Sequence, residues 1–293
     1  MHAAVRPGAV TAGLPSAVVV HEVDLLDHDG LRALVSSTQP TQIHHLGGMS
    51  SVGRSWEEPV RTVQVTGLST VVLLESALEL QERIGRAVHF VLASSAEIFG
   101  EPSVTPQDES TPVRPVSPYG SAKALAHASV GVYRRRGLPA SSLILYNHES
   151  PRRPPSFVTR KITQGVARIV REGEGVLTLG NLDARRDWGW APDYVDAMMR
   201  AAHGPADDYV IATGVDHSVR DFVATAFESA GMTDWEAHVA IDPDLFRPSD
   251  PAVLVGDATH ARKVLDWRPT RTFESVIEEM VRADVEQVKP SAS

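Results

Sequence analysis

Short apolar runs rich in β-branched residues alternate with longer helical patterns along the first half of the chain. The predicted strands cover residues 17–23, 42–46, 88–94 and 141–146. Helical patterns lie between them at residues 31–37, 56–80 and 119–135. Apolar strands separated by helices are typical of a parallel sheet that is covered on both faces. This order therefore predicts an α/β fold with a Rossmann-like, doubly wound parallel sheet.

The pattern changes after Asn147, where Pro151, Pro154 and Pro155 force a loop away from the sheet. Later helical patterns lie at residues 157–171, 193–202, 220–230 and 273–285, and short strands at 176–179 and 209–212. These elements are too short and too interrupted to build a second sheet-based domain. They predict a smaller α/β cap on the first domain, with the chain crossing between the two.

The composition excludes several functional classes. Acidic residues number 37 against 28 Lys and Arg, a net charge of −9, which argues against a nucleic-acid partner. The absence of cysteine excludes disulfides and thiol catalysis. The His44-His45 pair is expected to contain one core imidazole rather than two metal ligands, and we expect no metal site. No consecutive apolar run reaches the roughly 18 residues that span a bilayer. No apolar signal segment follows Met1 either, so we expect a cytoplasmic enzyme with no membrane partner.

One group of residues carries recognisable chemistry. Tyr119 and Lys123 are four residues apart and share one face of a predicted helix. A lysine ammonium beside a phenol stabilises the phenolate, which makes Tyr119 a candidate general base toward an alcohol. Ser95 follows the strand at 88–94, at the sheet edge where open parallel sheets bind their ligands. An ordinary surface pair on a helix is the alternative interpretation of the Tyr-Lys spacing.

Ser95 with Tyr119 and Lys123 resembles the catalytic triad of extended short-chain dehydrogenases/reductases. Longer strings are similar to GDP-mannose 4,6-dehydratases, and the similarity covers essentially the whole chain. These strings are residues 147–153, 157–162, 179–189, 209–214, 217–220, 247–248 and 256–259.

The resemblance implies the conversion of GDP-D-mannose to GDP-4-keto-6-deoxy-D-mannose, a hydro-lyase reaction with internally recycled NADP. Tyr119 would take the proton of the sugar 4-hydroxyl while hydride passes to NADP+, and Lys123 would hold the nicotinamide ribose. Ser95 would hydrogen-bond the C4 oxygen. Glu97 would remove the C5 proton and help to expel the 6-hydroxyl, unless it is an ordinary loop carboxylate. The implied catalytic residues are Ser95, Glu97, Tyr119 and Lys123.

The same strings imply the binding residues. Those that would contact NADP are Arg6, Asp24, Leu25, Leu46, Gly47, Tyr119, Lys123, His148 and Arg153. Those that would surround the nucleotide sugar are Asn147, Thr159, Lys161, Asn181, Arg186, Arg220 and Arg247. Guanidinium groups suit a diphosphate because they form bidentate, charge-assisted hydrogen bonds.

The resemblance also implies a division of labour between domains. Residues 1–150 would form the NADP-binding domain, with returns near 184–215 and 248–262. Residues 151–183, 216–247 and 263–293 would form the nucleotide-sugar-binding cap. A homodimer through two long helices is expected, with a tetramer as the alternative.

Departures from the family pattern occur mainly near the N-terminus. Met1–Arg6 resembles the second strand of the family, so the first strand, its glycine-rich loop and the first helix are missing from these residues. We expect that unit to lie upstream of Met1, with a degenerate homologue as the alternative. The 293 residues alone should bind NADP poorly, because the glycine-loop amides hold its pyrophosphate. Smaller departures are Ser95 for Thr, Ala96 for Ser, Met49 for Gln and Arg61 for Tyr. The segment 7–16 is also short and lacks the Arg-Ser-rich stretch that helps tetramers assemble.

Two other functions remain open from the sequence. A related dehydratase or 4-epimerase would act on a different nucleotide sugar, although an epimerase needs no base at C5 and Glu97 favours dehydration. A catalytically impaired homologue would bind the nucleotide sugar or a partner subunit without turnover. The base of the nucleotide and the identity of the sugar are not fixed by these residues.

Overall fold

The chain, described by a computed structural model over residues 1–246 and 253–288, forms two compact units. Unit 1 consists of residues 1–100, 112–144 and 198–209. Unit 2 contains, among the described residues, 101–111, 145–197, 210–246 and 253–288. The chain therefore crosses between the units several times, whereas the predicted assignment of one domain to NADP and one to the nucleotide sugar stays a prediction.

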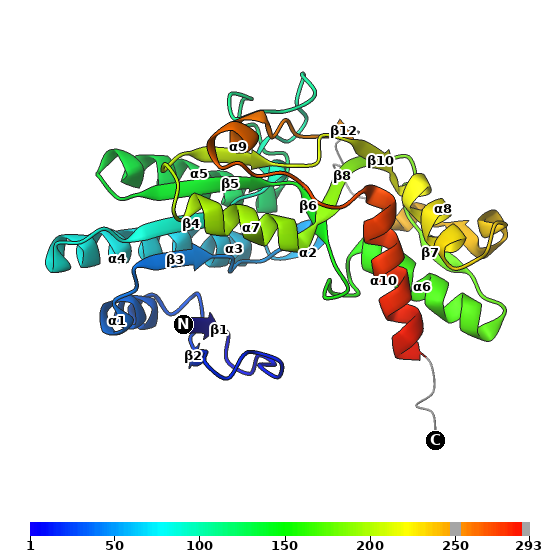
Figure 1. Cartoon of the computed structure of the whole chain (residues 1–293), viewed down its shortest axis with the longest axis horizontal. Coiled ribbons are helices and arrows are strands. Elements are labelled where there is room, and N and C mark those ends of the chain that lie inside the picture. Colours follow the sequence, from blue (N-terminus) through cyan, green and yellow to red (C-terminus); the bar gives the residue numbers. More distant parts are fainter. Residues whose placement is uncertain (247–252, 289–293) are drawn as a thin grey trace. The chain divides into compact units, whose positions relative to one another are not determined.

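Unit 1 is built on a sheet with the strand order β3-β4-β5-β9 (Figure 1). The strands are β3 (Gln42–His45), β4 (His89–Ala93), β5 (Ala140–Leu145) and β9 (Asp208–Ile211). β4 runs parallel to both β3 and β5. Successive residues of β4 and β5 are buried, because both faces of the sheet are covered. The predicted α/β fold with a parallel sheet is confirmed.

Helices of unit 1 pack against this sheet and bury its apolar core. They are α1 (His28–Thr38), α4 (Ser69–Ile84) and α5 (Pro118–Arg135). Leu31 of α1, Leu74 of α4, Phe90 of β4 and Val130 of α5 belong to one buried cluster. Helix α7 (Ala191–Ala201) lies between β8 and β9 in the chain; its residues 191–197 belong to unit 2 and its residues 198–201 to unit 1.

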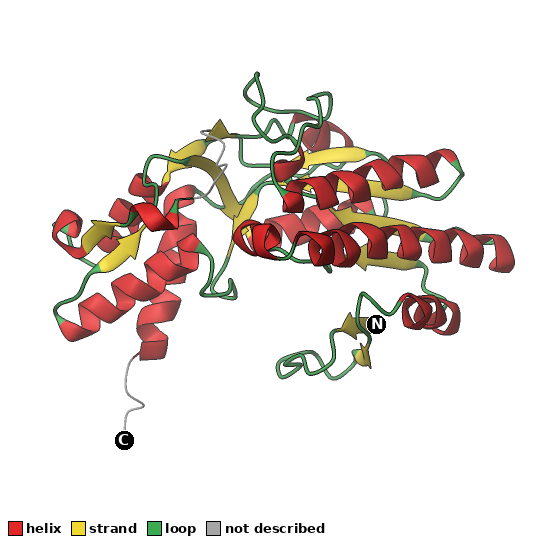
Figure 2. Ribbon diagram, turned by 180° about the vertical axis from the view of Figure 1, so that it is seen from behind, coloured by secondary structure: helices red, strands yellow, loops and turns green. Residues whose placement is uncertain are grey.

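Two strands near the N-terminus form a separate pair. β1 (His2–Val5) and β2 (Val19–Glu22) are parallel to each other and hydrogen-bond to no other strand among the described residues. Figure 2 shows the pair as two short strands apart from the larger sheet. The predicted strand at 17–23 is thus present in shortened form.

A continuous helical stretch runs from Pro59 to Ile84 through α3 (Pro59–Thr62), the π-helical segment η1 (Val63–Leu68) and α4. A shorter helix, α2 (Val52–Glu57), precedes it. By length and composition this stretch could cross a membrane. The sequence predicted no such segment, because a count of consecutive apolar residues overlooks a long helix with few charges. However, 61% of its apolar window is buried inside the protein, which is the pattern of a core helix.

Unit 2 is centred on β8 (Arg185–Trp190), which pairs with three other strands. These are β6 (Asn147–Glu149) and β12 (Val253–Leu254), both parallel to it, and the antiparallel β10 (Asp216–Ser218). A second parallel pair consists of β7 (Leu177–Leu179) and β11 (Val239–Ile241).

Helices α6 (Val158–Glu172), α8 (Val219–Ser229) and α10 (Phe273–Val288) pack together in unit 2 (Figure 1). Their buried side chains form one cluster with Trp188 of β8. The remaining short helices are η2 (Ala96–Ile98) in unit 1 and η3 (Trp235–His238), η4 (Pro243–Leu245) and α9 (Thr259–Val264) in unit 2.

Candidate active site

The carboxyl end of β4 carries the first two candidate catalytic residues. Ser95 caps the single 3₁₀ turn η2, because its Oγ accepts a hydrogen bond of 3.3 Å from the Glu97 amide. Both side chains are half-buried at this sheet edge. The turn is short, so the hydroxyl and the carboxylate follow the strand end within three residues of each other. This placement agrees with the ligand-binding edge of an open parallel sheet.

Helix α5 presents Tyr119 and Lys123 from its first turns. Ser117 caps the helix by accepting a 3.0 Å hydrogen bond from the Gly120 amide, and Pro118 occupies the first helical position. The Tyr119 amide donates to Ser55 Oγ of α2 at 3.2 Å, which ties this end of the helix to a buried neighbour. The Lys123 Nζ atom lies 5.9 Å from the centre of the Tyr119 ring. The predicted Tyr-Lys pair therefore shares one helix face.

A glycine allows the two halves of this cluster to meet. A Cβ atom at Gly120 would lie 2.6 Å from the backbone oxygen of Glu97, closer than real side chains come to a carbonyl. Helix α5 therefore packs directly against η2 at this point. The close approach brings the segment of Ser95 and Glu97 beside the helix that carries Tyr119 and Lys123.

Lys123 is buried beside the end of β4. Its Nζ donates a 2.7 Å hydrogen bond to the Ala93 carbonyl, and only 6% of the residue is exposed. Burial lowers the pKa of Lys123 from 10.5 to about 8, because the charged ammonium loses water. The remaining ammonium protons can serve ligand hydroxyl groups.

His45 at the end of β3 is the core imidazole that the sequence predicted, with 5% exposure. Burial, and then the nearby charge of Lys123, lower the pKa of His45 to about 3, so the ring is neutral. His45 pairs in register with Leu92, next to the Ala93 carbonyl that holds Lys123. Sequence reasoning did not connect this histidine with the candidate catalytic residue Lys123.

Among the described residues no group of three or more His, Asp or Glu side chains could hold a metal ion.

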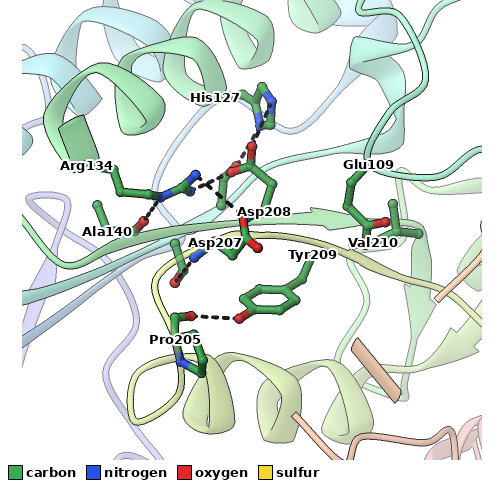
Figure 3. Close-up of polar contacts among 11 residues, drawn as sticks. Glu109, His127, Arg134, Ala140, Pro205, Asp207, Asp208, Tyr209 and Val210 are labelled. Atoms are coloured by element: carbon green, nitrogen blue, oxygen red, sulfur yellow. Dashed lines mark hydrogen bonds and ion pairs between the residues drawn. The ribbon is translucent and has the colours of Figure 1, made fainter. Parts of the chain in front are cut away.

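The far half of α5 is fixed to the sheet by charged contacts (Figure 3). Arg134 donates from Nη2 to Asp208 of β9 at 2.6 Å and from Nε to the Ala140 carbonyl of β5 at 2.7 Å. His127 shares a 2.8 Å hydrogen bond with Ser142 Oγ of β5. Burial is the main reason why the pKa of His127 is lowered. These contacts hold the helix in place from the end opposite to Tyr119.

Two of the predicted cofactor contacts in unit 1 lie against each other. A Cβ atom at Gly47 would lie 2.9 Å from Leu25 Cδ1, so the Leu25 side chain packs directly against the turn after β3. Asp24 is exposed and its Oδ1 accepts a 2.9 Å hydrogen bond from the Leu26 amide. Leu46, 60% exposed, and Arg6 both face solvent.

In unit 2 the predicted residues of β6 and α6 surround one buried carboxylate. Glu149, which sequence reasoning left without a role, is 1% exposed. It accepts a 2.6 Å hydrogen bond from Thr159 Oγ1 and forms an ion pair of 3.2 Å with Arg153 Nε. His148 shares a 2.8 Å hydrogen bond with the Tyr146 carbonyl through Nδ1, and its ring stacks on Tyr194 at 4.8 Å.

Further predicted residues of unit 2 lie on and around β8. Arg186 is buried in β8 and donates from Nη1 to the Arg185 carbonyl at 2.7 Å. Arg220, at the start of α8, forms a 3.0 Å ion pair with Asp183. Asn181 accepts a 2.9 Å hydrogen bond from the amide of that same aspartate. The remaining predicted residues are Asn147 in β6, the exposed Lys161 in α6, and Arg247, which lies outside the described residues.

Comparison with known proteins identifies the family. A profile described as GDP-mannose 4,6 dehydratase matches residues 9–280 of the chain. The GDP-mannose 4,6-dehydratase of Sinorhizobium fredii (strain HH103) is 42% identical over 288 residues, covering 92% of this chain and 82% of that protein. The chain belongs to the GDP-mannose 4,6-dehydratase family. Another relative, the GDP-mannose 4,6 dehydratase of Homo sapiens, is 40% identical over 92% of this chain and 77% of its own length.

The fold of this family member also matches solved structures. The UDP-glucose 4-epimerase of Thermus thermophilus, solved in complex with NAD, aligns with a TM-score of 0.82 at 27% identity. The alignment covers 95% of this chain and 88% of the epimerase. The expected resemblance and the Rossmann-like α/β fold are thus confirmed, whereas the roles of individual residues stay predictions.

Proposed function

We propose that the protein converts GDP-D-mannose to GDP-4-keto-6-deoxy-D-mannose and water. The observation that carries this proposal is the cluster at the end of β4, where Glu97 accompanies the Tyr119–Lys123 pair in a chain of the dehydratase family. A Tyr-Lys pair suits the oxidation of an alcohol. A carboxylate beside it adds a base for a carbon-bound proton, which a simple alcohol oxidation does not require.

Tyr119 acts as the general base in the first step. It takes the proton of the sugar 4-hydroxyl, and the buried ammonium of Lys123 stabilises the phenolate that accepts it. Ser95 hydrogen-bonds the C4 oxygen and holds it near the phenol. The resulting 4-ketone makes the neighbouring C5 proton acidic.

Glu97 acts in the second step. Its carboxylate removes the C5 proton and then delivers a proton to the departing 6-hydroxyl, which leaves as water. The same carboxylate distinguishes the proposal from a 4-epimerase, because an epimerase inverts C4 without touching C5. The half-buried position of Glu97 strengthens this interaction relative to one in bulk water.

A nicotinamide cofactor would supply a reversible hydride acceptor, which would take the hydride from C4 and later return it to C6, so that the net redox change is zero. The residues of unit 1 fit such a group. The Lys123 ammonium is anchored on the Ala93 carbonyl, with protons left for ribose hydroxyls. We propose NADP rather than NAD, because exposed Arg6 follows β1 as a cation suited to an additional phosphate.

The nucleotide sugar is proposed to bind the basic and amide residues of unit 2. Fixed guanidinium groups such as Arg186 and Arg220 suit the diphosphate. The protein is proposed to act as a homodimer in the cytoplasm.

The test supplies the purified protein with GDP-D-mannose and a large excess of NADP, since these residues are expected to bind NADP poorly. Mass spectrometry follows the loss of water, and NMR follows the configuration at C4. UDP-glucose and NAD form the comparison arms. Dehydration of GDP-D-mannose that requires NADP is the expected result. Inversion of UDP-glucose at C4 without dehydration would favour the epimerase instead, and binding of GDP-mannose without turnover would favour the impaired homologue.

The variant Tyr119→Phe tests the assigned base. Removal of a general base should lower product formation by about 10³-fold. Calorimetric binding of GDP-mannose should survive, because the phenylalanine ring still fills the place of the Tyr119 ring, which is 9% exposed. Near-normal turnover by this variant would remove Tyr119 from the mechanism.

A further inference from the structure

Glu149 joins residues that belong to two different predicted ligand sites. It is the last residue of β6, where it pairs in register with Trp190 of β8. A single oxygen of its carboxylate, Oε2, contacts both Thr159 Oγ1 at 2.6 Å and Arg153 Nε at 3.2 Å. Arg153 is a predicted contact of the cofactor, and Thr159 is a predicted contact of the nucleotide sugar. All three residues lie in unit 2.

The surroundings fix this carboxylate firmly. Burial raises the pKa of Glu149, and the charge of Arg153 and the Thr159 hydroxyl oppose that shift by stabilising the anion. Helix α6 begins at Val158 without a side-chain cap, so an anion bonded to its first turn also complements the helix dipole. At 1% exposure little water screens these interactions.

Arg153 is held on a second side. Its guanidinium carbon lies 3.9 Å from the centre of the Phe157 ring, and Phe157 is the N-cap residue of α6. The contact of Nε with Glu149 is an ion pair without the alignment of a good hydrogen bond. The two terminal nitrogens have no partner among the described residues and remain able to bind an anion. A bound anion would therefore fix Arg153, and through Oε2 also the Thr159 hydroxyl.

We propose that Glu149 is a positioning residue that couples cofactor binding at Arg153 to nucleotide-sugar binding at Thr159. The inference rests on the proposed function and adds a regulatory property to that site. Because Oε2 contacts both Arg153 and Thr159, each ligand stabilises the arrangement of the Glu149 cluster to which the other ligand binds. The coupling is positive and, as thermodynamics requires, the same in both directions.

The experiment measures the dissociation constant of NADPH with and without saturating GDP-mannose. This pair cannot react, because oxidation at C4 needs the oxidised cofactor. In the wild type, GDP-mannose should tighten NADPH binding by at least about fivefold, within the usual range for coupled sites. We define the coupling ratio as the NADPH dissociation constant without GDP-mannose divided by that with GDP-mannose. In Glu149→Gln this ratio should fall below about twofold, because the neutral amide weakens the link to Arg153.

The chain contains a matched control whose partner residues lie on α6, as Thr159 does. Asp284 of α10 is another buried carboxylate with a threonine and an arginine, Thr163 at 2.7 Å and Arg160 at 2.7 Å. None of these three is a predicted ligand contact. Asp284→Asn should lower the melting temperature, as Glu149→Gln should, but keep the wild-type coupling ratio. If Glu149→Gln does not fold, Thr159→Val should remove the coupling and Thr159→Ser should retain it.

The outcomes separate this inference from the proposed function. A wild-type protein that binds neither ligand would overturn both. A wild-type ratio near one, or a Glu149→Gln ratio equal to that of the wild type, would overturn the coupling alone. Loss of coupling in Asp284→Asn as well would also overturn it, since any loosening of unit 2 would then suffice.

Discussion

Lys123 holds a positive charge where water hardly reaches. Its ammonium depends on one carbonyl of β4, and burial lowers its pKa to about 8, so at neutral pH the charge is retained at a cost in stability. Such a cost is common where a residue is kept for chemistry rather than for folding. The proposed function explains it, because an ammonium in this place stabilises a phenolate and serves ribose hydroxyls.

Lys123→Met should remove this cost in a pH-dependent way. The folded-state pKa lies below the ordinary 10.5, so the unfolded chain binds the proton more tightly. The wild-type free energy of unfolding therefore rises between about pH 8 and 10.5 through this group. The stability of Lys123→Met relative to wild type should consequently fall by about 2 kcal/mol between roughly pH 7 and pH 10. Denaturant unfolding at both pH values measures it.

The exposed Lys263 of α9 offers the control for that experiment. Lys263→Met should show a stability difference from wild type that is the same at both pH values. An equally flat difference for Lys123→Met would mean that the buried ammonium keeps its ordinary proton affinity.

Glu97→Gln should separate the two halves of the proposed reaction. Oxidation at C4 does not use the carboxylate, whereas removal of the C5 proton does, so reduced nicotinamide should accumulate without 6-deoxy product. Absorbance of the reduced cofactor and mass spectrometry of the sugar measure the two halves. Glu101→Gln, at an exposed carboxylate nearby in sequence, should behave as wild type. Exchange of the C5 proton with deuterium at the wild-type rate in Glu97→Gln would assign the base elsewhere.

At the scale of elements, the pattern of apolar residues predicted the central strands of unit 1 and the long helices. β4 and β5 are buried along their length, and α5 begins at Pro118, one residue from the predicted start. β8 was missed, because Arg185–Trp190 begins with three charged residues and has no run of β-branched residues; it is buried by pairing with three other strands. The four-residue spacing of Tyr119 and Lys123 on α5 could be predicted because it depends only on local helix geometry. The role of Glu149 could not, since its partners are brought together by a turn and a helix start.

Gly120 tests whether the contact of α5 with η2 builds the site. Alanine at this position would place Cβ 2.6 Å from the Glu97 carbonyl, so the helix must shift away from the turn. Overpacking of this kind costs about 1–3 kcal/mol, and turnover should fall at least about tenfold because Tyr119 moves with the helix. Thermal unfolding and the dehydration assay measure the two effects.

Gly131 of the same helix is the matched control. A Cβ there would meet only the Arg135 side chain, at 3.8 Å. Gly131→Ala should stabilise the protein by up to about 1 kcal/mol through helix propensity and leave turnover unchanged. A Gly120→Ala variant that behaved like Gly131→Ala would show that the close approach is not needed.

At the scale of the whole molecule, unit 1 exposes apolar side chains on neighbouring helices. We define the apolar patch as Val60 of α3, Val63 and Leu68 of η1, and Leu125 and Val132 of α5, each at least 38% exposed. The helices η1 and α5 come very close, since a Cβ atom at Gly67 would lie 2.8 Å from Leu125. An apolar surface on a pair of packed helices is suited to a second copy of the same surface around a twofold axis.

Charged substitutions in the apolar patch should dissociate the proposed homodimer into monomers. Leu125 and Val132 are 42% and 46% exposed on one face of α5, so glutamate at both positions should leave the monomer folded. In a dimer the same charges would be buried without partners, which costs several kcal/mol. The dimer dissociation constant should therefore rise at least about a hundredfold, measured by sedimentation. Val176→Glu, at a 55%-exposed site in unit 2, should sediment as the wild type does. A wild-type monomer, or a double variant that remains dimeric, would refute an interface at the apolar patch.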